Sequence, residues 1–458
     1  MGGFSVAGKR VVVVGGSRSG VAAAELLVSR GASVLLTDLK EHLPDEARLR
    51  AAGVDLELGG HRAGSLAAAD LVVLSPGVPP GQPAVQAARA AGVRAIAEIE
   101  LASRWLKGRV VAVTGTKGKS TTTTLIGRIL NEAGVKASAG GNLGPALSLQ
   151  VAASTPDAVH VVEVSSFQLE GIETFHPWIA VMLNFSPDHL DRHPSMEAYA
   201  AAKARIFSNQ DGGDWAVVNA DDAGAIALAH GARARRRWFA LDSPIGEGVT
   251  VSAGRVVERT PQGELPLFPV SAVPLIGRHL LGDVLAATSV ARLIGVAPAP
   301  IAAAVGAFTG LEHALEPVAE IAGVRFVNDS KATNVAAAGK SIESFARGLV
   351  PIMGGRYKGG DFRELRAVIA GRARAVVAIG ESRGIIRDAL GDVVPLREAA
   401  SMAEAVRAAF AEARAGGTVL LAPGCSSFDM FTDYAERGRV FKQEVARLAE
   451  ERRDDREQ

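Results

Sequence analysis

The segment Arg109–Gly134, RVVAVTGTKGKSTTTTLIGRILNEAG, constrains the fold of this chain more than any other stretch of its sequence. It begins with a run rich in valine, which is typical of a buried strand, and continues into a turn bounded by glycines. Leucine and isoleucine then recur at helical spacing up to Gly134, a residue type that commonly ends a helix. The sequence therefore predicts a strand, a loop and a helix in direct succession.

The loop itself, Gly115–Ser120, has the composition of a phosphate-binding turn. Its small residues leave backbone N–H groups that can point at one anion, and the N-terminus of the following helix adds a partial positive charge. Lys119 is expected to neutralise the outer phosphates of a nucleotide, and the Ser120 hydroxyl to reach a Mg²⁺ ion. The spacing departs from the full Walker pattern because its first glycine would fall on Val113. A plain turn is the alternative, and the position of Gly-Lys-Ser between an apolar strand and an apolar-periodic helix disfavours it.

Composition limits the classes of protein to which the chain can belong. Its 458 residues are enough for about three domains at roughly 150 residues each. The formal net charge is only +1 and the basic residues are spread along the chain, so no nucleic-acid partner is expected. The run Arg233–Arg237 is expected to be a solvated helix end rather than a nucleic-acid patch.

Cysteine usage and hydropathy indicate the compartment. Cys425 is the only cysteine, which excludes an intrachain disulfide and fits a reducing compartment. The valine run Val11–Val14 is too short for a signal-peptide core, and no apolar run approaches the ~18 residues that span a membrane. We therefore expect a cytoplasmic protein with no membrane partner.

The first segment, residues 6–97, alternates short apolar strands with helical stretches, which predicts βαβ units around a parallel sheet. Its opening turn, GGSRSG, is similar to a dinucleotide fingerprint, but Ser17 replaces the middle glycine, which disfavours NAD. Asp38 closes the next strand about where a ribose-binding acid would lie. The interpretation therefore stays open between a nucleotide-like ligand and a turn of this kind without a ligand.

The second segment carries several polar groups at the ends of apolar strands. Asn142 lies in a glycine-rich loop that lets the backbone approach a ligand closely. Glu163 interrupts an apolar strand, and because an unpaired buried carboxylate is costly, it is expected to meet the Mg²⁺ ion at Ser120. His189 follows the next strand, where a metal ligand and a surface histidine are both possible. Lys203 lies among alanines in a helical stretch, where an ordinary exposed lysine is the default interpretation. A desolvated lysine would instead have a lowered pKa and leave an amine able to add CO₂, which the sequence alone does not suggest.

The third segment restarts the alternation of strands and helices after a run of small residues around 306–310. Polar residues again follow its apolar strands, and the carboxyl ends of parallel strands usually converge on a ligand. Two lysines and several hydroxyls among them favour an acidic small molecule. These polar stretches are Asn328–Asn334, Gly354–Lys358 and Pro423–Asp429.

Taken together, GTKGKST at 115–121, VEVSSFQLE at 162–170, NDSKATN at 328–334 and CSSFD at 425–429 resemble the Mur ligase family. Within that family the likeness is greatest to the ligases that add D-glutamate, and it runs over nearly the whole chain. The resemblance implies three α/β domains, each built on a mainly parallel sheet with flanking helices. A Rossmann-like N-terminal domain would span 1–97, a P-loop ATPase domain 98–310, and a Rossmann-like C-terminal domain 311–458.

The resemblance also implies an activity, namely ATP-dependent addition of D-glutamate to UDP-N-acetylmuramoyl-L-alanine in peptidoglycan precursor synthesis, by a monomer. An acyl phosphate would form first, because a free carboxylate is too poor an electrophile for an amine. Residues implied to bind ATP are Gly115, Thr116, Lys117, Gly118, Lys119, Ser120, Thr121 and Asp329. Residues implied to face the UDP-sugar are Ser19, Asp38 and Asn142, and those implied around D-glutamate are Lys331, Thr333, Lys358, Ser427 and Tyr434. Two Mg²⁺ ions are implied at Ser120, Glu163, His189 and a carbamylated Lys203, and the implied catalytic residues are Lys119, Glu163, His189 and Lys203.

Some positions depart from the family pattern. Leu280 and Asp283 stand where the family usually has asparagines expected near the adenine, and Ala314 stands where an arginine is expected near ATP. Losing a charge-assisted contact costs on the order of 1.5–3 kcal/mol, so ATP affinity or turnover is expected to be reduced. Lys117, where related ligases often have asparagine, is a candidate cation to replace that arginine, and Tyr434 replaces a common phenylalanine.

Other functions remain open at this point. One is a ligase of the same superfamily that uses another amino acid or makes polyglutamate, such as folylpolyglutamate synthase, against which NDSKATN argues. Another is a nicotinamide-dependent oxidoreductase, which would leave Glu163, His189 and Lys203 without a role. The last is an impaired relative that binds ATP without efficient turnover.

Overall fold

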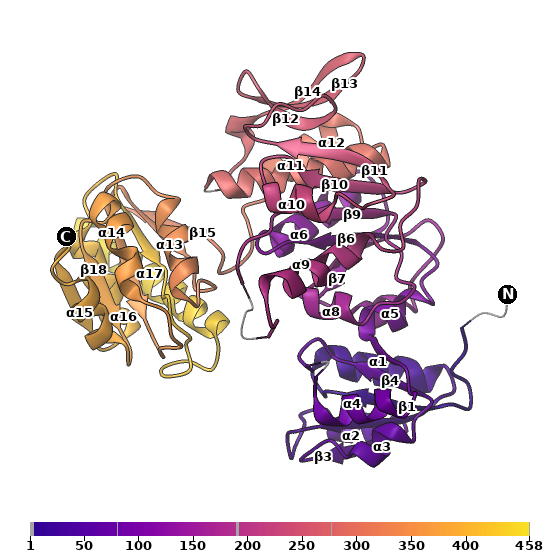
Figure 1. The fold of residues 1–458 in the computed structure, drawn as a ribbon. Helices are drawn as coiled ribbons and strands as arrows, with labels where there is room; N and C mark the ends of the chain where they lie inside the picture. Colours follow the sequence, from indigo (N-terminus) through magenta and orange to yellow (C-terminus); the bar gives the residue numbers. More distant parts are fainter. Residues whose placement is uncertain (1–3, 80, 189–191, 276, 458) are drawn as a thin grey trace. The chain divides into compact units, whose positions relative to one another are not determined.

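The computed structural model describes residues 4–457 except for 80, 189–191 and 276. The chain forms two compact units, coloured from indigo to salmon and from orange to yellow in Figure 1. The first unit comprises Met1–Val273 and His279–Phe308, and the second comprises Pro274–Arg278 and Thr309–Gln458.

The first sheet explains why the chain opens on a continuous run of valines. Its strand order is β3-β2-β1-β4-β5, and all neighbours are parallel. Val11 and Val13 of β1 pack on the face covered by α1, whereas Val12 and Val14 pack on the face covered by α3 and α4. Both faces are therefore buried, which is the condition under which a strand is apolar throughout. The elements are β1 (Arg10–Val14), α1 (Arg18–Ser29), β2 (Ser33–Asp38), α2 (Glu46–Ala51), β3 (Val54–Leu58), α3 (Ala63–Ala67), β4 (Leu71–Leu74), α4 (Pro83–Ala90), β5 (Ala95–Ala97) and α5 (Glu98–Ser103).

The second sheet places the phosphate-loop strand β6 in its interior, between β9 and β8. The order of the described strands is β14-β13-β12-β11-β10-β9-β6-β8-β7, parallel from β7 to β12 and antiparallel for β13 and β14. The strands are β6 (Arg109–Thr114), β7 (Ala137–Gly141), β8 (Val159–Glu163), β9 (Ile179–Met182), β10 (Trp215–Asn219), β11 (Arg235–Ala240), β12 (Gly248–Ser252), β13 (Arg255–Thr260) and β14 (Gly263–Pro269). The helices are α6 (Lys119–Glu132), α7 (Leu147–Gln150), α8 (Ser166–Glu170), α9 (Met196–Ala204), η1 (Arg205–Phe207), α10 (Ala223–Leu228), η2 (Val270–Ala272), α11 (Arg278–Ile294) and α12 (Pro298–Gly306).

The interpretation of Arg233–Arg237 as a helix end is wrong, because β11 begins at Arg235. Arg237 is buried and pairs with the buried carboxylate of Glu258 on β13. Arg292 of α11 approaches the same carboxylate at 2.6 Å. One residue of a basic run in the sequence therefore becomes part of an internal ion-pair network, while Arg235 and Arg236 stay exposed.

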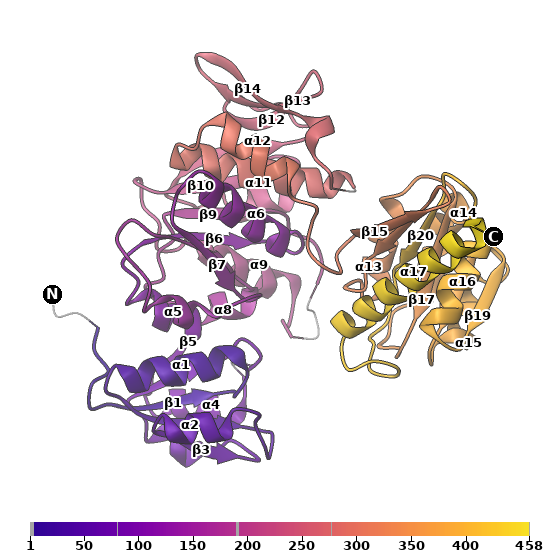
Figure 2. The same cartoon turned by 180° about the vertical axis from the view of Figure 1, so that it is seen from behind.

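The third sheet lies in the second unit, where Figure 1 labels its orange and yellow elements. Its order is β15-β16-β20-β17-β18-β19, parallel except for the edge strand β15. Figure 2 shows the long helix α17 lying across it, and residues of α16 and α17 share its buried core. The elements are β15 (Glu316–Ile321), β16 (Val324–Asn328), α13 (Val335–Glu343), β17 (Leu349–Gly354), η3 (Phe362–Leu365), α14 (Arg366–Arg372), β18 (Val376–Ile379), α15 (Arg383–Leu390), β19 (Leu396–Ala399), α16 (Met402–Glu412), β20 (Thr418–Leu421) and α17 (Tyr434–Glu457).

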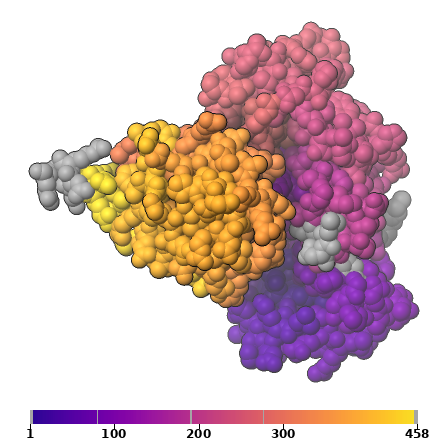
Figure 3. Space-filling view, turned by 60° about the vertical axis from the view of Figure 1, so that its left-hand side comes forward, coloured from indigo at the N-terminus to yellow at the C-terminus, as the bar shows by residue number. Residues whose placement is uncertain are grey.

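The predicted α/β architecture with mainly parallel sheets is confirmed. Each of the three sheets falls within one of the segments 1–97, 98–310 and 311–458, while those domain boundaries stay a prediction. Among the described residues, no helix is both long enough and apolar enough to cross a bilayer. The space-filling view in Figure 3 shows one face of the second unit, in orange and yellow.

Candidate active site

The phosphate loop follows β6 and leads directly into α6. Gly118 caps that helix with a φ of +85°, in the left-handed region that favours glycine. A Cβ at this position would also lie 2.1 Å from Oδ1 of Asp283, so no larger residue fits. The side chain of Asn184, just after β9, also fixes the backbone of the loop. It accepts a hydrogen bond from the Lys117 N–H at 2.9 Å and donates one to the Lys117 carbonyl at 3.0 Å.

Lys119 is the first residue of α6, and its side chain bends back over the loop. Nζ donates to the carbonyl oxygens of Gly115 at 3.0 Å and Thr116 at 2.8 Å. The first N–H groups of a helix have no acceptor within the helix, so an anion held by them would lie beside this ammonium group. Ser120 is half-buried at the same helix end. The geometry is therefore that of a phosphate site.

Glu163 ends β8, and in the sheet it lies level with Val113, two residues before the loop. Its side chain is buried, and Oε1 accepts a hydrogen bond from Nδ2 of Asn142 at 3.0 Å. Oε2 is also buried, and none of the described residues forms a hydrogen bond with it. A buried carboxylate oxygen without a donor is costly, and a cation is the partner that would satisfy it. The residues present thus fit a divalent ion at this position.

Lys203 of α9 is buried next to the same loop, and its Nζ donates to the Gly115 carbonyl at 2.7 Å. Burial, and then the positive charge of Lys119, lower the pKa of Lys203 to about 7, although the carboxylates of Asp188 and Glu163 oppose the shift. The ring of Tyr199 lies 4.9 Å from Nζ. Lys203 is therefore poised between an ammonium group and a neutral amine near neutral pH.

A cavity of about 470 Å³ lies between the loops of the first sheet and the glycine-rich loop after β7. It brings together Ser19, Asp38 and Asn142, the three residues predicted to face a UDP-sugar. The Asp38 carboxylate accepts the backbone N–H groups of Gly16 and Lys40, so it also shapes the turn around the cavity. Asn142 lines the cavity and bonds to Glu163 as well, which connects the cavity to the phosphate loop.

Arg192 and Tyr199 belong to this region, although the sequence pattern did not single out either of them. The Arg192 guanidinium donates to the carbonyl of Val78 at 2.8 Å, so it ties the segment after β9 to the cavity wall. The Tyr199 hydroxyl lies 3.3 Å from Oγ1 of Thr116 in the phosphate loop. Asn184 could have been identified as a site residue from the sequence, because it is a polar residue that comes just after an apolar strand. His189 lies outside the described residues, so the structure does not place it.

Asp283, one of the departures from the family pattern, lies behind Gly118. Burial raises the pKa of its carboxyl to about 7, against the Thr122 hydroxyl and the charge of Lys119, which lower it. Its Oδ2 is buried, and within the described ranges it has no hydrogen-bond partner. A protonated carboxyl offers one donor and one acceptor, as an amide does, so Asp283 can stand in for asparagine below that pH.

In the second unit, the predicted amino-acid site is spread over three loops that follow parallel strands. The loop after β16 meets the loop after β20 through a hydrogen bond from Gly424 N–H to the Ala332 carbonyl at 2.9 Å. The loops after β17 and β20 pair through Arg356 and Ser426. Ser330 donates to the carbonyl of Tyr434 at 2.7 Å. The structure thus brings together the backbone segments that carry Lys331, Thr333, Lys358, Ser427 and Tyr434.

Asp329 has a different environment from the other predicted residues of this unit. It is buried, accepts the Leu315 N–H at 3.2 Å and bonds to the Ser341 hydroxyl. Within the unit it therefore holds the segment that contains Ala314 against the end of β16. A contact with ATP stays a prediction.

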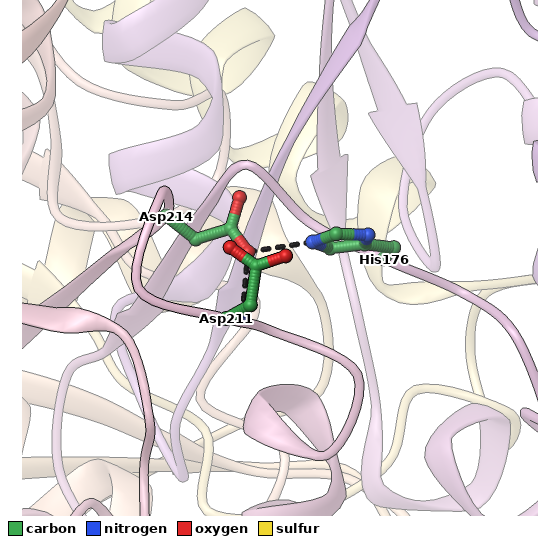
Figure 4. Close-up of side chains that lie close together, drawn as sticks. All are labelled: His176, Asp211 and Asp214. Carbon is green, nitrogen blue, oxygen red and sulfur yellow. Dashed lines mark hydrogen bonds and ion pairs between the residues drawn. The ribbon is translucent and has the colours of Figure 1, made fainter.

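His176, Asp211 and Asp214 form another cluster of potential metal ligands, shown in Figure 4. The cluster lies at the amino ends of strands of the central sheet. His176 and Asp214 precede β9 and β10, whereas the phosphate loop lies where strands end. Nε2 of His176 lies 2.6 Å from Oδ2 of Asp214, which also accepts the Asp211 N–H at 2.7 Å. The carboxylate is thus already engaged by protein donors, and the cluster is explained as a hydrogen-bonded turn.

Comparison with known proteins agrees with this geometry. Three family models match the chain: the Mur ligase MurD-like N-terminal domain at residues 9–97, the Mur ligase middle domain at 113–291, and the Mur ligase glutamate ligase domain at 315–425. A UDP-N-acetylmuramoylalanine--D-glutamate ligase of Acidobacterium capsulatum is 46% identical over 95% of both chains. The protein of the same name from Koribacter versatilis is 43% identical over 98% of this chain and 99% of its own.

Solved structures add evidence for the fold. The UDP-N-acetylmuramate-alanine ligase of Thermotoga maritima is 19% identical and superposes with a TM-score of 0.60 over 96% of this chain and 100% of its own. A pseudomurein peptide ligase from Methanothermus fervidus is 16% identical, with a TM-score of 0.59 and the same coverage. The full-length likeness to curated relatives settles the family. This chain belongs to the Mur ligase family, whose members are ATP-dependent amide ligases.

Proposed function

We propose that this protein joins D-glutamate to UDP-N-acetylmuramoyl-L-alanine and converts ATP to ADP and phosphate, acting as a monomer. The names of relatives 43–46% identical over the full chain support the choice of substrates. One structural observation carries the proposal: Asn142 lines the cavity of the first sheet and also bonds to Glu163 beside the phosphate loop. A carboxylate extending from a nucleotide sugar in that cavity would therefore end next to a bound triphosphate.

The phosphate loop would hold ATP through the backbone N–H groups of Gly115–Thr121, with Lys119 on the outer phosphates. Transfer of the terminal phosphoryl group to the sugar carboxylate spreads negative charge over its oxygens, and Lys119 would stabilise that charge. The resulting acyl phosphate is attacked by the amine of D-glutamate, and phosphate leaves as the amide forms. Lys331, Thr333, Lys358, Ser427 and Tyr434 would hold the carboxylates of D-glutamate, and Asp329 would lie near ATP.

Two Mg²⁺ ions would be held by Ser120 with Glu163, and by Glu163 with His189 and Lys203. When bound, the ions would neutralise charge on the phosphates during transfer. The buried, unpartnered oxygen of Glu163 supports a cation there. An ammonium group at Lys203 would repel it, whereas a carbamate on the same nitrogen would supply an anionic oxygen ligand. The lowered pKa of Lys203 favours the neutral amine from which a carbamate forms.

Carbamylation of Lys203 is therefore expected to depend on pH. Because its pKa is about 7, the neutral fraction of the amine rises from about one tenth at pH 6 to about nine tenths at pH 8. NMR of the protein in ¹³C-bicarbonate should show a carbamate signal that grows between these pH values. The Lys203→Met variant should lack that signal. A signal of equal size in the variant, or none in the unmodified protein at pH 8, would contradict the assignment.

Phosphate release from ATP by the purified chain tests the function directly. UDP-N-acetylmuramoyl-L-alanine would be supplied with D-glutamate, with L-glutamate or with no amino acid. We expect release only when the nucleotide sugar and the D isomer are both present. Release with L-glutamate would indicate another ligase of the superfamily, and no release in any mixture would indicate a relative that binds ATP without turnover.

A further inference from the structure

The second unit contains a buried guanidinium that no described carboxylate neutralises through an ion pair. Arg437 lies in the first turns of α17 and is 1% exposed. Nε donates to Oγ of Ser330 at 2.9 Å, Nη2 to the Ser330 carbonyl at 2.9 Å, and Nη1 to the Cys425 carbonyl at 3.1 Å. All three acceptors are neutral. Burial of a charge is costly unless it is paired, so this arrangement calls for an explanation.

The charge on Arg437 persists near neutral pH. Burial lowers the pKa of its guanidinium to about 10, while the charges of Cys425 and Asp429 raise it. No ion pair within hydrogen-bonding reach joins Asp429 to Arg437 in the described part of the chain, and Oδ2 of Asp429 accepts the Glu381 N–H at 2.9 Å. Its other oxygen is buried and has no hydrogen-bond partner among the described residues. The positive charge of Arg437 is thus only partly balanced by its surroundings.

The position of Arg437 in the sheet relates it to the proposed amino-acid site. Its guanidinium donates to two of the three loops that carry this site, since Ser330 follows β16 and Cys425 follows β20. The third loop lies alongside: a Cβ built on Gly355, just after β17, would be 3.2 Å from Nη1 of Arg437. One planar group therefore joins two strand ends by hydrogen bonds and lies next to the third. A lysine could reach only part of this set, because its ammonium group lacks the fork of the guanidinium.

We propose that Arg437 is a positioning residue for a dicarboxylate substrate: it holds the loops after β16 and β20 in register beside the loop after β17, and it places an incompletely balanced positive charge among them. The proposal rests on the proposed function, in which these loops receive D-glutamate. The two carboxylates of a bound substrate would supply negative charge that the neutral acceptors around Arg437 do not provide. Burying this cation therefore costs free energy in the free protein, and the bound substrate offsets that cost in the complex. This arrangement favours a dianionic amino acid over a monoanionic one.

Two substitutions separate the charge from the hydrogen bonds. Arg437→Lys keeps the positive charge and loses the fork, whereas Arg437→Gln keeps some hydrogen bonding and loses the charge. Arg439 lies two residues further along α17 and is exposed, so Arg439→Gln is the matched control. In the full chain we expect Arg437→Gln to raise the KM for D-glutamate at least tenfold and Arg437→Lys to raise it about threefold. The KM values for ATP and for the nucleotide sugar should stay within twofold, and Arg439→Gln should match the unmodified enzyme.

Steady-state phosphate release with each substrate varied in turn, together with the Tm of each variant, provides the test. A selective rise in the D-glutamate KM, larger for glutamine than for lysine at position 437, supports the proposal. A loss of kcat alone, or equal rises in all three KM values, overturns it while leaving the proposed function intact. If the unmodified enzyme needs no D-glutamate for release, the proposed function fails and this inference fails with it. Should Arg437→Gln not fold, Arg437→Lys and Ser330→Ala decide by the same KM pattern.

Discussion

Replacing Lys119 with alanine is expected to lower kcat for phosphate release by about 1000-fold or more, equivalent to about 4 kcal/mol of transition-state stabilisation. Its ammonium group already lies within 3.0 Å of two carbonyls of the phosphate loop, beside the N–H groups that would receive the phosphates. Without Lys119, charge that develops on a transferring phosphoryl group would lose the cation that this helix end places beside those N–H groups. Steady-state kinetics of the variant with saturating ATP would measure the loss.

The matched comparison is Lys117→Asn in the same loop. Lys117 is exposed, and its backbone rather than its side chain bonds to Asn184. If Lys117 takes over the role of the arginine expected at position 314, where this chain has alanine, its loss should raise the KM for ATP several-fold and leave kcat nearly unchanged. An unchanged ATP KM would remove that role from Lys117. A Lys119→Ala enzyme that kept more than a tenth of its turnover would contradict the assignment of the phosphate site.

Replacing Glu163 with glutamine should separate catalysis from stability. We expect phosphate release to fall by about 1000-fold, because an amide cannot supply the charge that a divalent cation needs. The free energy of unfolding without ligand should stay the same or increase, since the substitution removes a buried charge with one unpartnered oxygen. Thermal unfolding would also test metal binding. In the unmodified protein the Tm with ATP and Mg²⁺ should exceed the Tm with ATP alone, and in Glu163→Gln this difference should disappear.

Glu98→Gln is the control for exchanging a buried carboxyl for an amide. Glu98 is also buried, and its Oε1 accepts both the N–H and the hydroxyl of Ser148. Burial raises the pKa of its carboxyl, and an amide of the same shape keeps an oxygen that can accept both hydrogen bonds from Ser148. We expect this variant to keep kcat within about threefold. Full activity of Glu163→Gln, or equal losses in both variants, would argue against a metal role for Glu163.

Local sequence patterns were sufficient for the elements that carry the phosphate site. The valine run from Arg109 and the helical spacing after Lys119 predicted β6 and α6, because burial and helical periodicity act over about a dozen neighbouring residues. Glu163 could be singled out for the same reason: one acid in an apolar strand breaks the local pattern. The arginine run near Arg235 misled, since exposure of a basic residue depends on which strand it enters and what lies opposite.

The sequence by itself determined the alternation of strands and helices, the phosphate loop, and the polar residues at strand ends. Only the tertiary structure decided that Asn142 joins the cavity to Glu163, that Lys203 loses its solvent beside Gly115, and that Arg437 is buried among neutral acceptors. These contacts join residues separated by between 12 and 107 positions in the chain. Desolvation and pairing depend on every group packed around a side chain, and no local pattern specifies those neighbours.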